Sequence, residues 1–311
     1  MSPRGLFLFL STGIIWGTPY FFIAIATDHF STASIVWIRV AVGSLVLLPV
    51  ALARGALKPA LKAWPYVTLF AVTEMVFPWA FITQAQNTVS SSLAGLLITT
   101  VPFIAAFIIG LLGDRSAWHP LTVTGLIIGF SGVTALLGID AFSGRIEVIP
   151  VLMLLGAATG YAIAPIIADR KLHDVPTLGV ITLSMMVVSV IYAVPAAITL
   201  PADIAQAPTP SAWFAVSYLG VVTSALGFIF FFALIKEVGP GRSTLITYVN
   251  VVVAILLGVV FLNEPLTLGI IVGFPLVVLG SYLASQRREA YVRKRDRVKD
   301  PTGEIGLPTH P

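Results

Sequence analysis

Residues 90–112 read SSSLAGLLITTVPFIAAFIIGLL and contain no charged side chain. A helix needs about 20 apolar residues to cross the roughly 30 Å hydrocarbon core of a bilayer. The run is continuous and lacks the alternation of apolar and polar residues that a strand of a membrane barrel would show. We therefore expect this stretch to be a membrane-spanning helix.

Segments of this kind recur along the whole chain and are joined by short connections. Helices are the expected structure in each, because lipid offers no partner to an unpaired backbone group. The sequence thus predicts an all-α polytopic membrane protein with ten transmembrane helices. The ten expected spans are Gly5–Ala26, Ser34–Ala53, Trp64–Gln84, Ser90–Leu112, His119–Gly138, Val148–Ala168, Thr177–Leu200, Ser211–Ile235, Ser243–Leu262 and Thr267–Ser285.

The composition agrees with a membrane protein and excludes several kinds of chemistry. Hydrophobic residues make up 57% of the 311 residues and charged residues 10%, whereas a soluble domain has about 25% charged residues. The mean hydropathy is +0.97. The chain has no cysteine, which excludes disulfides and thiolate chemistry, and its four histidines lack metal-ligand spacing. We expect no cofactor and no metal site.

The basic residues indicate the orientation of the chain. With the N-terminus in the cytoplasm, every Lys and Arg except Arg39 and Arg145 falls in an inner connection or in a basic tail, residues 286–311. Cytoplasmic connections carry the excess of Lys and Arg, so we expect a multi-pass inner-membrane protein with both termini cytoplasmic. Contact with anionic lipid then explains the net charge of +4. A nucleic-acid partner is not expected.

The second half of the chain repeats the first at an offset of 148 residues. Leu97-Ile98-Thr99 then falls on Leu245-Ile246-Thr247, and Gly110 falls on Gly258. Each half holds five expected spans, and because five is odd the halves must enter the membrane from opposite sides. We predict two inverted five-helix repeats, residues 5–138 and 148–285, with a small-molecule substrate bound between them near the midplane.

Along residues 5–285 an ordered set of residues stands out: Trp16-Gly17, Arg39, Pro102, Asp114, Glu264, Gly273 and Gly280. In this set the chain resembles the drug/metabolite transporter superfamily, in its EamA-type branch. One departure is Asn250, which stands in the second half where Pro102 stands in the first. The resemblance implies secondary transport of small metabolites such as amino acids, often as export.

Small residues and prolines inside the spans predict close packing and kinks. Gly125–Gly129 and Gly269–Gly273 form Gly-x-x-x-Gly patterns, which could pack helices within a monomer or join a homodimer. Pro19, Pro78 and Pro102 each remove a backbone hydrogen bond. Each proline could serve as a hinge or as a static kink.

Glu74 and Arg39 are the ionisable residues expected at depth in the membrane. Glu74 is near the middle of the third expected span, where a charge costs about 2.5–3.5 kcal/mol on the insertion scale. It could bind a cationic substrate group, carry a proton, or be a carboxylate satisfied by a structural partner. Arg39 could pair with Glu74 and take part in gating, reach the interface, or bind a substrate carboxylate.

Aromatic and polar residues inside the spans are candidates for the lining of a substrate site. Aromatic faces suit apolar or cationic ligands, and hydroxyl and amide groups offer hydrogen bonds. Aromatic residues can instead be interfacial anchors. Besides Glu74, the candidates for substrate binding are Trp16, Tyr20, Trp79, Thr99, Tyr161, Tyr248 and Asn250, with Gln84 as a further polar group.

The leading hypothesis is a secondary transporter that works by alternating access, exports amino acids or related compounds, and couples to protons through Glu74. The sequence has no P-loop, dinucleotide fingerprint or nucleophile elbow, so ATP hydrolysis is not expected. An intramembrane enzyme would need more ionisable groups at depth than Glu74 and Arg39, and we expect the chain not to be an enzyme. A receptor or scaffold without transport is the other alternative.

Overall fold

The computed structural model describes residues 2–113, 120–142, 147–238, 243, 246–280 and 282–283. All regular structure in these residues is helical, which confirms the predicted all-α class. The basic tail, residues 286–311, and Asp114 lie outside the described residues.

Seven helical runs in the described residues are long and apolar enough to cross a membrane. Three are single helices, namely α3 (Thr32–Ala53), α10 (Val148–Lys171) and α11 (Thr177–Ala205). The other four are built from pieces placed end to end: α1 (Pro3–Gly17) with α2 (Pro19–Thr27), α5 (Trp64–Ala71) with η1 (Val72–Val76) and α6 (Phe77–Ala85), α7 (Ser91–Ile98) with α8 (Val101–Leu111), and α12 (Pro210–Tyr218) with η3 (Leu219–Leu226) and α13 (Gly227–Val238).

Three shorter apolar helices coincide with the fifth, ninth and tenth expected spans. They are Pro120–Leu136 within α9 (Pro120–Phe142), α15 (Ile246–Phe261), and residues Leu268–Gly280. That these helices also cross the membrane, which would make ten spans, stays a prediction. A short helix, α4 (Leu57–Lys62), connects α3 to α5.

Prolines interrupt the composite spans where the sequence predicts kinks. Pro19, Pro78 and Pro102 each stand in the first turn of the helix that follows an interruption, because proline lacks the N–H that would continue the preceding helix. Threonine hydroxyls satisfy carbonyls near two of these breaks. Thr18 donates to the Ile15 carbonyl at 2.8 Å, and Thr100 donates to the Leu97 carbonyl at 2.7 Å.

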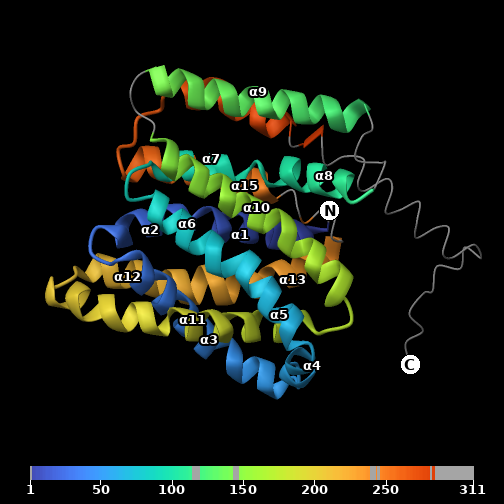
Figure 1. The fold of residues 1–311 in the computed structure, drawn as a ribbon, viewed down its shortest axis with the longest axis vertical. Helices are drawn as coiled ribbons and strands as arrows, with labels where there is room; N and C mark the ends of the chain where they lie inside the picture. The colour runs from blue at the N-terminus through green and yellow to red at the C-terminus, as the bar shows by residue number, and fades with distance from the viewer. Residues whose placement is uncertain are drawn as a thin grey trace, which may run out of the picture.

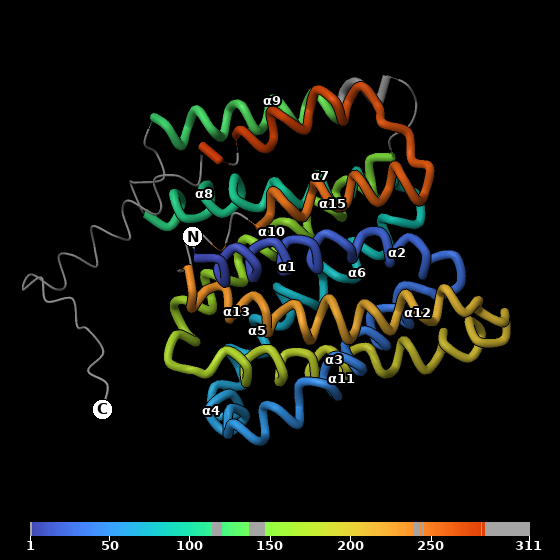
Figure 2. Tube along the Cα trace, turned by 180° about the vertical axis from the view of Figure 1, so that it is seen from behind, coloured from blue at the N-terminus to red at the C-terminus, as the bar shows by residue number. Residues whose placement is uncertain are grey.

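The helices lie side by side with their long axes running in roughly the same direction (Figure 1). At one edge of the bundle are α9 and residues 268–280, and at the other are α3, α4 and α11 (Figures 1 and 2). The N-terminus is at one end of the helix axes, and α2 and the start of α12 reach the other end. We call these ends the N-terminal side and the far side.

The helix contacts between the two halves occur in matching pairs. When the halves are exchanged, the contact of α1 with α13 corresponds to that of α6 with α10, and the contact of α3 with α11 corresponds to itself. The π-helical turn η1, residues 72–76, corresponds at the 148-residue offset to residues 220–224, which lie within η3. Two related halves would produce this correspondence.

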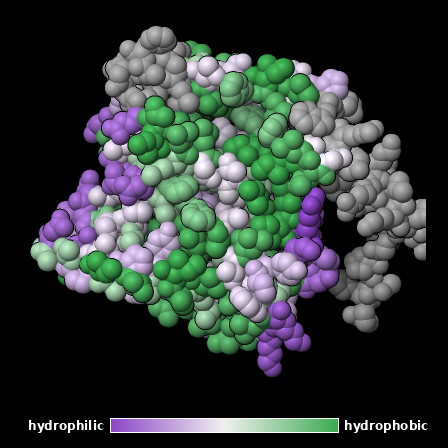
Figure 3. All heavy atoms as spheres, in the orientation of Figure 1, coloured by the Kyte–Doolittle hydropathy of each residue, from purple (hydrophilic) through white to green (hydrophobic). Residues whose placement is uncertain are grey.

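The surface of the helices is strongly apolar. Val190 on α11, Phe130 on α9 and Leu45 on α3 are 75%, 72% and 69% exposed. In the view of Figure 3, hydrophobic side chains dominate the middle of the molecule, and hydrophilic side chains gather toward the two ends of the helix axes. So much exposed apolar surface would be unfavourable in water, so the protein is a multi-pass membrane protein.

Buried apolar residues form one large cluster toward the far side and two separate clusters toward the N-terminal side. The far cluster joins both halves through residues such as Ile23, Leu97, Leu154 and Leu219. One near cluster holds residues of α3, α5, α10 and α11, and the other holds Leu8, Leu234 and Ile246 from α1, α13 and α15. Each of the three clusters contains residues from both halves, and the ring contacts of Trp16 with Phe228 and of Phe231 with Phe232 link the two near clusters.

Glycines allow close contacts between helices of the same chain. The Cα position of Gly280 lies against Gly129 and the Gly125 carbonyl, and Gly273 lies against the Gly132 carbonyl. These residues of the Gly-x-x-x-Gly patterns thus pack helices within the monomer. Gly17 of α1 likewise lies against α15, where an added Cβ would be 2.5 Å from Val253 Cβ and 2.7 Å from the Asn250 carbonyl.

We predict that Gly17→Ala lowers the free energy of unfolding by about 1–3 kcal/mol, the usual cost of overpacking. The new methyl group would press on the backbone of α15, which cannot move as a side chain can. Thermal unfolding in detergent measures the effect. Gly156→Ala is the control, since its methyl would meet only the Phe81 ring, at 3.1 Å. Equal melting temperatures for the two variants would contradict the tight α1–α15 contact.

Candidate functional site

Glu74 stands at the centre of the π-helical turn η1. A wide turn of this kind leaves carbonyls without their usual partners and is often found at functional sites. The Tyr192 hydroxyl of α11 donates to the Val76 carbonyl at 3.0 Å. Gly160 of α10 lies directly against the Thr73 carbonyl, where any side chain would collide. The turn is therefore held in place by α10 and α11.

The Glu74 side chain lies deep in the protein and is only partly buried. Across from it, Tyr161 of α10 is within the range of electrostatic interaction. Glu74 and Arg39 do not form the ion pair that the sequence suggests as one role for them. The ion pairs of the described residues are Arg4 with Glu237 and His173 with Asp174, both involving exposed side chains.

Arg39 is instead held by a serine and a tryptophan. Its Nε donates to the Ser224 Oγ at 2.9 Å, and its guanidinium carbon lies 3.6 Å from the centroid of the Trp79 ring. A guanidinium above an aromatic face is attracted by the ring quadrupole. Ser224 belongs to η3 and itself donates to the Leu219 carbonyl at 2.9 Å. A residue of the π-helical turn in the second half thus helps to hold the Arg39 side chain of the first half in place.

Two tyrosines complete this arrangement. Tyr161 lies close to the Trp79 side chain and within electrostatic range of Tyr20 and Arg39. Tyr20 and Trp79 are 9% and 4% exposed. We call Tyr20, Arg39, Glu74, Trp79 and Tyr161 the central cluster. Its members come from α2, α3, η1, α6 and α10, and all five are candidates expected from the sequence.

Other candidate residues lie in contacts between or within helices. Trp16 donates through Nε1 to the Thr223 carbonyl at 3.0 Å and packs on Phe231 with the ring centroids 4.6 Å apart. The Asn250 amide, with its nitrogen facing the acceptors, donates to the Gly13 carbonyl at 2.7 Å. These two residues join α1 to η3 and α15 to α1.

The remaining candidates have local or peripheral positions. Thr99 is buried, and its hydroxyl bonds to the Leu96 carbonyl at the break between α7 and α8. Gln84 accepts a hydrogen bond from Thr32 at 2.8 Å and links α6 to α3. Tyr248 is partly buried on α15. None of these three belongs to the central cluster.

Acidic residues cap two helix starts on the far side. Asp203 accepts hydrogen bonds from the Ser31 backbone N–H at 3.1 Å and from its hydroxyl at 2.9 Å. Glu264 accepts from the backbone N–H groups of Ser91 and Ser92, at 2.6 and 3.0 Å, and from the Ser92 hydroxyl. A carboxylate at a helix N-terminus is favourable. These contacts tie α11 to α3, and the segment after α15 to α7.

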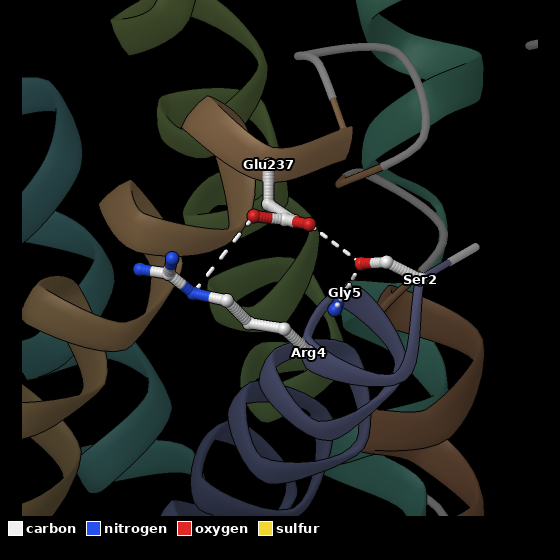
Figure 4. Close-up of polar contacts among 4 residues, drawn as sticks. All are labelled: Ser2, Arg4, Gly5 and Glu237. Atoms are coloured by element: carbon white, nitrogen blue, oxygen red, sulfur yellow. Dashed lines mark hydrogen bonds and ion pairs between the residues drawn. The ribbon is translucent and has the colours of Figure 1, made fainter.

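On the N-terminal side, Glu237 at the end of α13 contacts the start of α1 (Figure 4). Its carboxylate accepts from the Ser2 hydroxyl at 2.5 Å and lies 3.8 Å from the Arg4 Nε. Ser2 also accepts from the Gly5 N–H at 3.0 Å. This contact joins α1 to α13, the helices that carry Leu8 and Leu234 of one near cluster. Among the described residues, no group of three or more His, Asp or Glu side chains could hold a metal.

Sequence reasoning missed Ser224, Asp203 and the capping role of Glu264. Ser224 is one of several serines in apolar surroundings, and its contact with Arg39 joins residues 185 positions apart. Glu264 stands in the ordered set of family residues, but that pattern does not indicate which helix start it caps. Only contacts between distant segments could reveal these three roles.

Comparison with known proteins identifies the family. The EamA-like transporter family matches the chain twice, over residues 3–138 and 148–286. The chain belongs to the EamA-like transporter family. This finding confirms the resemblance to drug/metabolite transporters that the sequence suggests. The matched ranges together cover most of the chain.

Relatives of this EamA-like protein are transporters by name. The uncharacterized inner membrane transporter YedA of Escherichia coli (strain K12) is 28% identical over 281 residues, 87% of this chain and 89% of YedA. A protein of Streptantibioticus cattleyicolor named "Probable terminal-alkyne amino-acid exporter" is 23% identical over 289 residues, 91% and 94% of the two chains. A crystal structure with 20% identity has the same fold, with a TM-score of 0.63 over 92% of this chain and 98% of that chain.

Ser224→Ala should lower the free energy of unfolding by about 1–3 kcal/mol, because the buried Nε of Arg39 would lose its acceptor. Ser184→Ala is a matched control. Ser184 is also fully buried, but its hydroxyl has no hydrogen-bond partner, so its removal should cost little. Thermal unfolding of both variants in detergent measures the difference. A Ser184→Ala variant as unstable as Ser224→Ala would contradict the role of Ser224 in holding Arg39.

Proposed function

We propose that this EamA-like transporter is a secondary transporter that carries a small metabolite by alternating access between two inverted halves, residues 5–138 and 148–285. The observation that carries the proposal is the central cluster, in which two ionisable side chains, Arg39 and Glu74, lie deep in an apolar bundle. Such residues in a membrane are expected at substrate or proton pathways. The two family matches and the corresponding turns η1 and η3 support the two halves.

The distribution of apolar clusters supports a state closed on the far side. There, one cluster joins both halves, and Asp203 and Glu264 add polar contacts at the starts of α3 and α7. On the N-terminal side the buried residues form two smaller clusters, which are linked through partly buried rings such as Trp16 and Phe228. Opening the far side would require release of the Glu264 contacts with Ser91 and Ser92.

Amino acids or related compounds are the proposed substrates, and export is the proposed direction. The relative named "Probable terminal-alkyne amino-acid exporter", 23% identical to this chain, supports the substrate class and the direction. The excess of Lys and Arg on the N-terminal side, as at Arg54, Lys58 and Lys62, supports cytoplasmic termini. Export would then begin with binding from the N-terminal side.

The direct test is reconstitution of the purified protein into liposomes with a panel of radiolabelled amino acids. We expect flux of at least one compound, accelerated by an imposed pH gradient. Flux should not require ATP. A protein that moves no compound in the panel, in either direction, would contradict transport of this substrate class.

Glu74→Gln should remove the response of flux to the pH gradient while leaving some exchange of substrate. The amide keeps the shape of the side chain but cannot take up or release the coupling proton. Initial rates at several imposed gradients measure this response. Glu237→Gln is the control, since Glu237 lies at the end of α13, outside the central cluster. An unchanged gradient response in Glu74→Gln would rule out coupling through this residue.

A reversible cross-link can test whether the far side must open. A Cβ added at Gly258 of α15 would collide with the Glu264 carboxylate, which would have to move aside, and would lie 2.6 Å from the Ser92 Oγ of α7. Cysteines at both positions should then be close enough to form a disulfide. The chain has no other cysteine. Oxidation of the double variant should stop flux and reduction should restore it, whereas Ser92→Cys and Gly258→Cys alone should not respond. Full cross-linking with undiminished flux would show that α7 and α15 need not separate here.

A further inference from the structure

Arg39 is a buried cation without an acidic partner in the described part of the chain. The residue is 8% exposed. A guanidinium has five N–H donors, yet the described residues accept one hydrogen bond from it, at Nε. The two terminal nitrogens donate to no described residue. These two nitrogens are not fully enclosed by the protein, so they retain some accessible surface.

The surroundings of Arg39 hold its position without neutralising its charge. Its aromatic and hydroxyl neighbours, Trp79, Ser224, Tyr20 and Tyr161, are polar or polarisable groups without formal charge. An arginine keeps its charge in proteins, and an uncompensated charge inside a protein is costly. A negative group from outside the chain would reduce this cost.

The geometry favours a carboxylate as that group. The N–H donors lie in the plane of the guanidinium, and Trp79 covers one face of that plane. Ser224 occupies the Nε position. The edge formed by the two terminal nitrogens therefore remains for an end-on, bidentate contact, the arrangement in which arginine binds planar carboxylates.

We propose that Arg39 is the carboxylate-binding residue of the transport site, and that Glu74 receives the positively charged group of the same substrate. The substrate class is then a small zwitterion that carries both groups, as an α-amino acid does. This inference rests on the proposed function and deepens it. Tyr161 is within electrostatic range of both residues.

The proposed contact would also let both halves respond to the substrate. Arg39 comes from α3 of the first half, and its partner Ser224 comes from η3 of the second. A carboxylate bound to the terminal nitrogens would contact a side chain that belongs to the first half and is hydrogen-bonded to the second. A ligand lacking the carboxylate would leave the charge of Arg39 uncompensated and should bind more weakly.

Binding of matched compounds to the full-length wild-type protein tests this proposal without relying on a variant. The probes are the standard L-amino acids, the amines formed by removing their carboxylates, and their methyl esters. Thermal stabilisation in detergent is measured for each. At least one amino acid should stabilise the protein, and its amine and ester should bind at least tenfold more weakly. An amine that binds as tightly as its amino acid, or stabilisation by none of the amino acids, would overturn the proposal.

Variants then assign the effect to Arg39. Arg39→Gln should weaken binding of the amino acid at least tenfold and leave binding of the amine little changed, so the preference for the amino acid over the amine should disappear. Arg39→Lys should restore part of this preference, because lysine keeps the charge but not the forked geometry. A preference that persists in a folded Arg39→Gln protein would overturn the assignment. Flux of a compound without a carboxylate in the liposome assay would preserve the transport function while refuting this inference.

Discussion

A charged side chain deep in a membrane-spanning bundle must be held by protein, because lipid offers it neither hydrogen bonds nor counter-charge. Arg39 shows how this constraint is met, with Ser224 at its Nε and the Trp79 ring against one face of its guanidinium. Tyr161 of α10 lies close to Trp79 and within electrostatic range of Arg39. Holding one charge thus draws α3, α6, α10 and η3 to a common point. The candidate site and the contact between the halves depend on the same few residues.

The π-helical turns extend the same principle to the backbone. A wide turn leaves carbonyls unpaired, and in a bilayer each needs a partner from the protein. Tyr192 supplies one for Val76 in η1, and Trp16 supplies one for Thr223 in η3. Both donors are aromatic side chains from neighbouring helices. A distortion placed at corresponding positions in two spans brings Glu74 and Ser224 into the interior from opposite halves, which suits a site that two moving bodies share.

The apolar contacts suggest how such movement is divided. Glycines such as Gly17 and Gly280 bring helix backbones into direct contact, and packed surfaces of this kind slide poorly. The two near clusters are smaller than the far one, and for them to part the ring contacts of Trp16 with Phe228 and of Phe231 with Phe232 would have to break. On the far side, the Glu264 carboxylate caps the start of α7 by accepting hydrogen bonds from backbone N–H groups. Water could replace the carboxylate in these hydrogen bonds if the far side opened.

Hydropathy and charge in the sequence determined the helical class, the apolar spans and the depth of Arg39 and Glu74, because these are local properties that lipid imposes residue by residue. The sequence also indicated Tyr20, Trp79 and Tyr161 as interior residues. It could not separate them from Trp16 and Asn250, which join helices, because spans that are apolar all round carry little information about rotation. Only the tertiary structure brought Ser224 to Arg39 and showed that Arg39 and Glu74 do not form an ion pair. Contacts between residues so distant in the chain depend on how whole helices pack, and no local pattern encodes that packing.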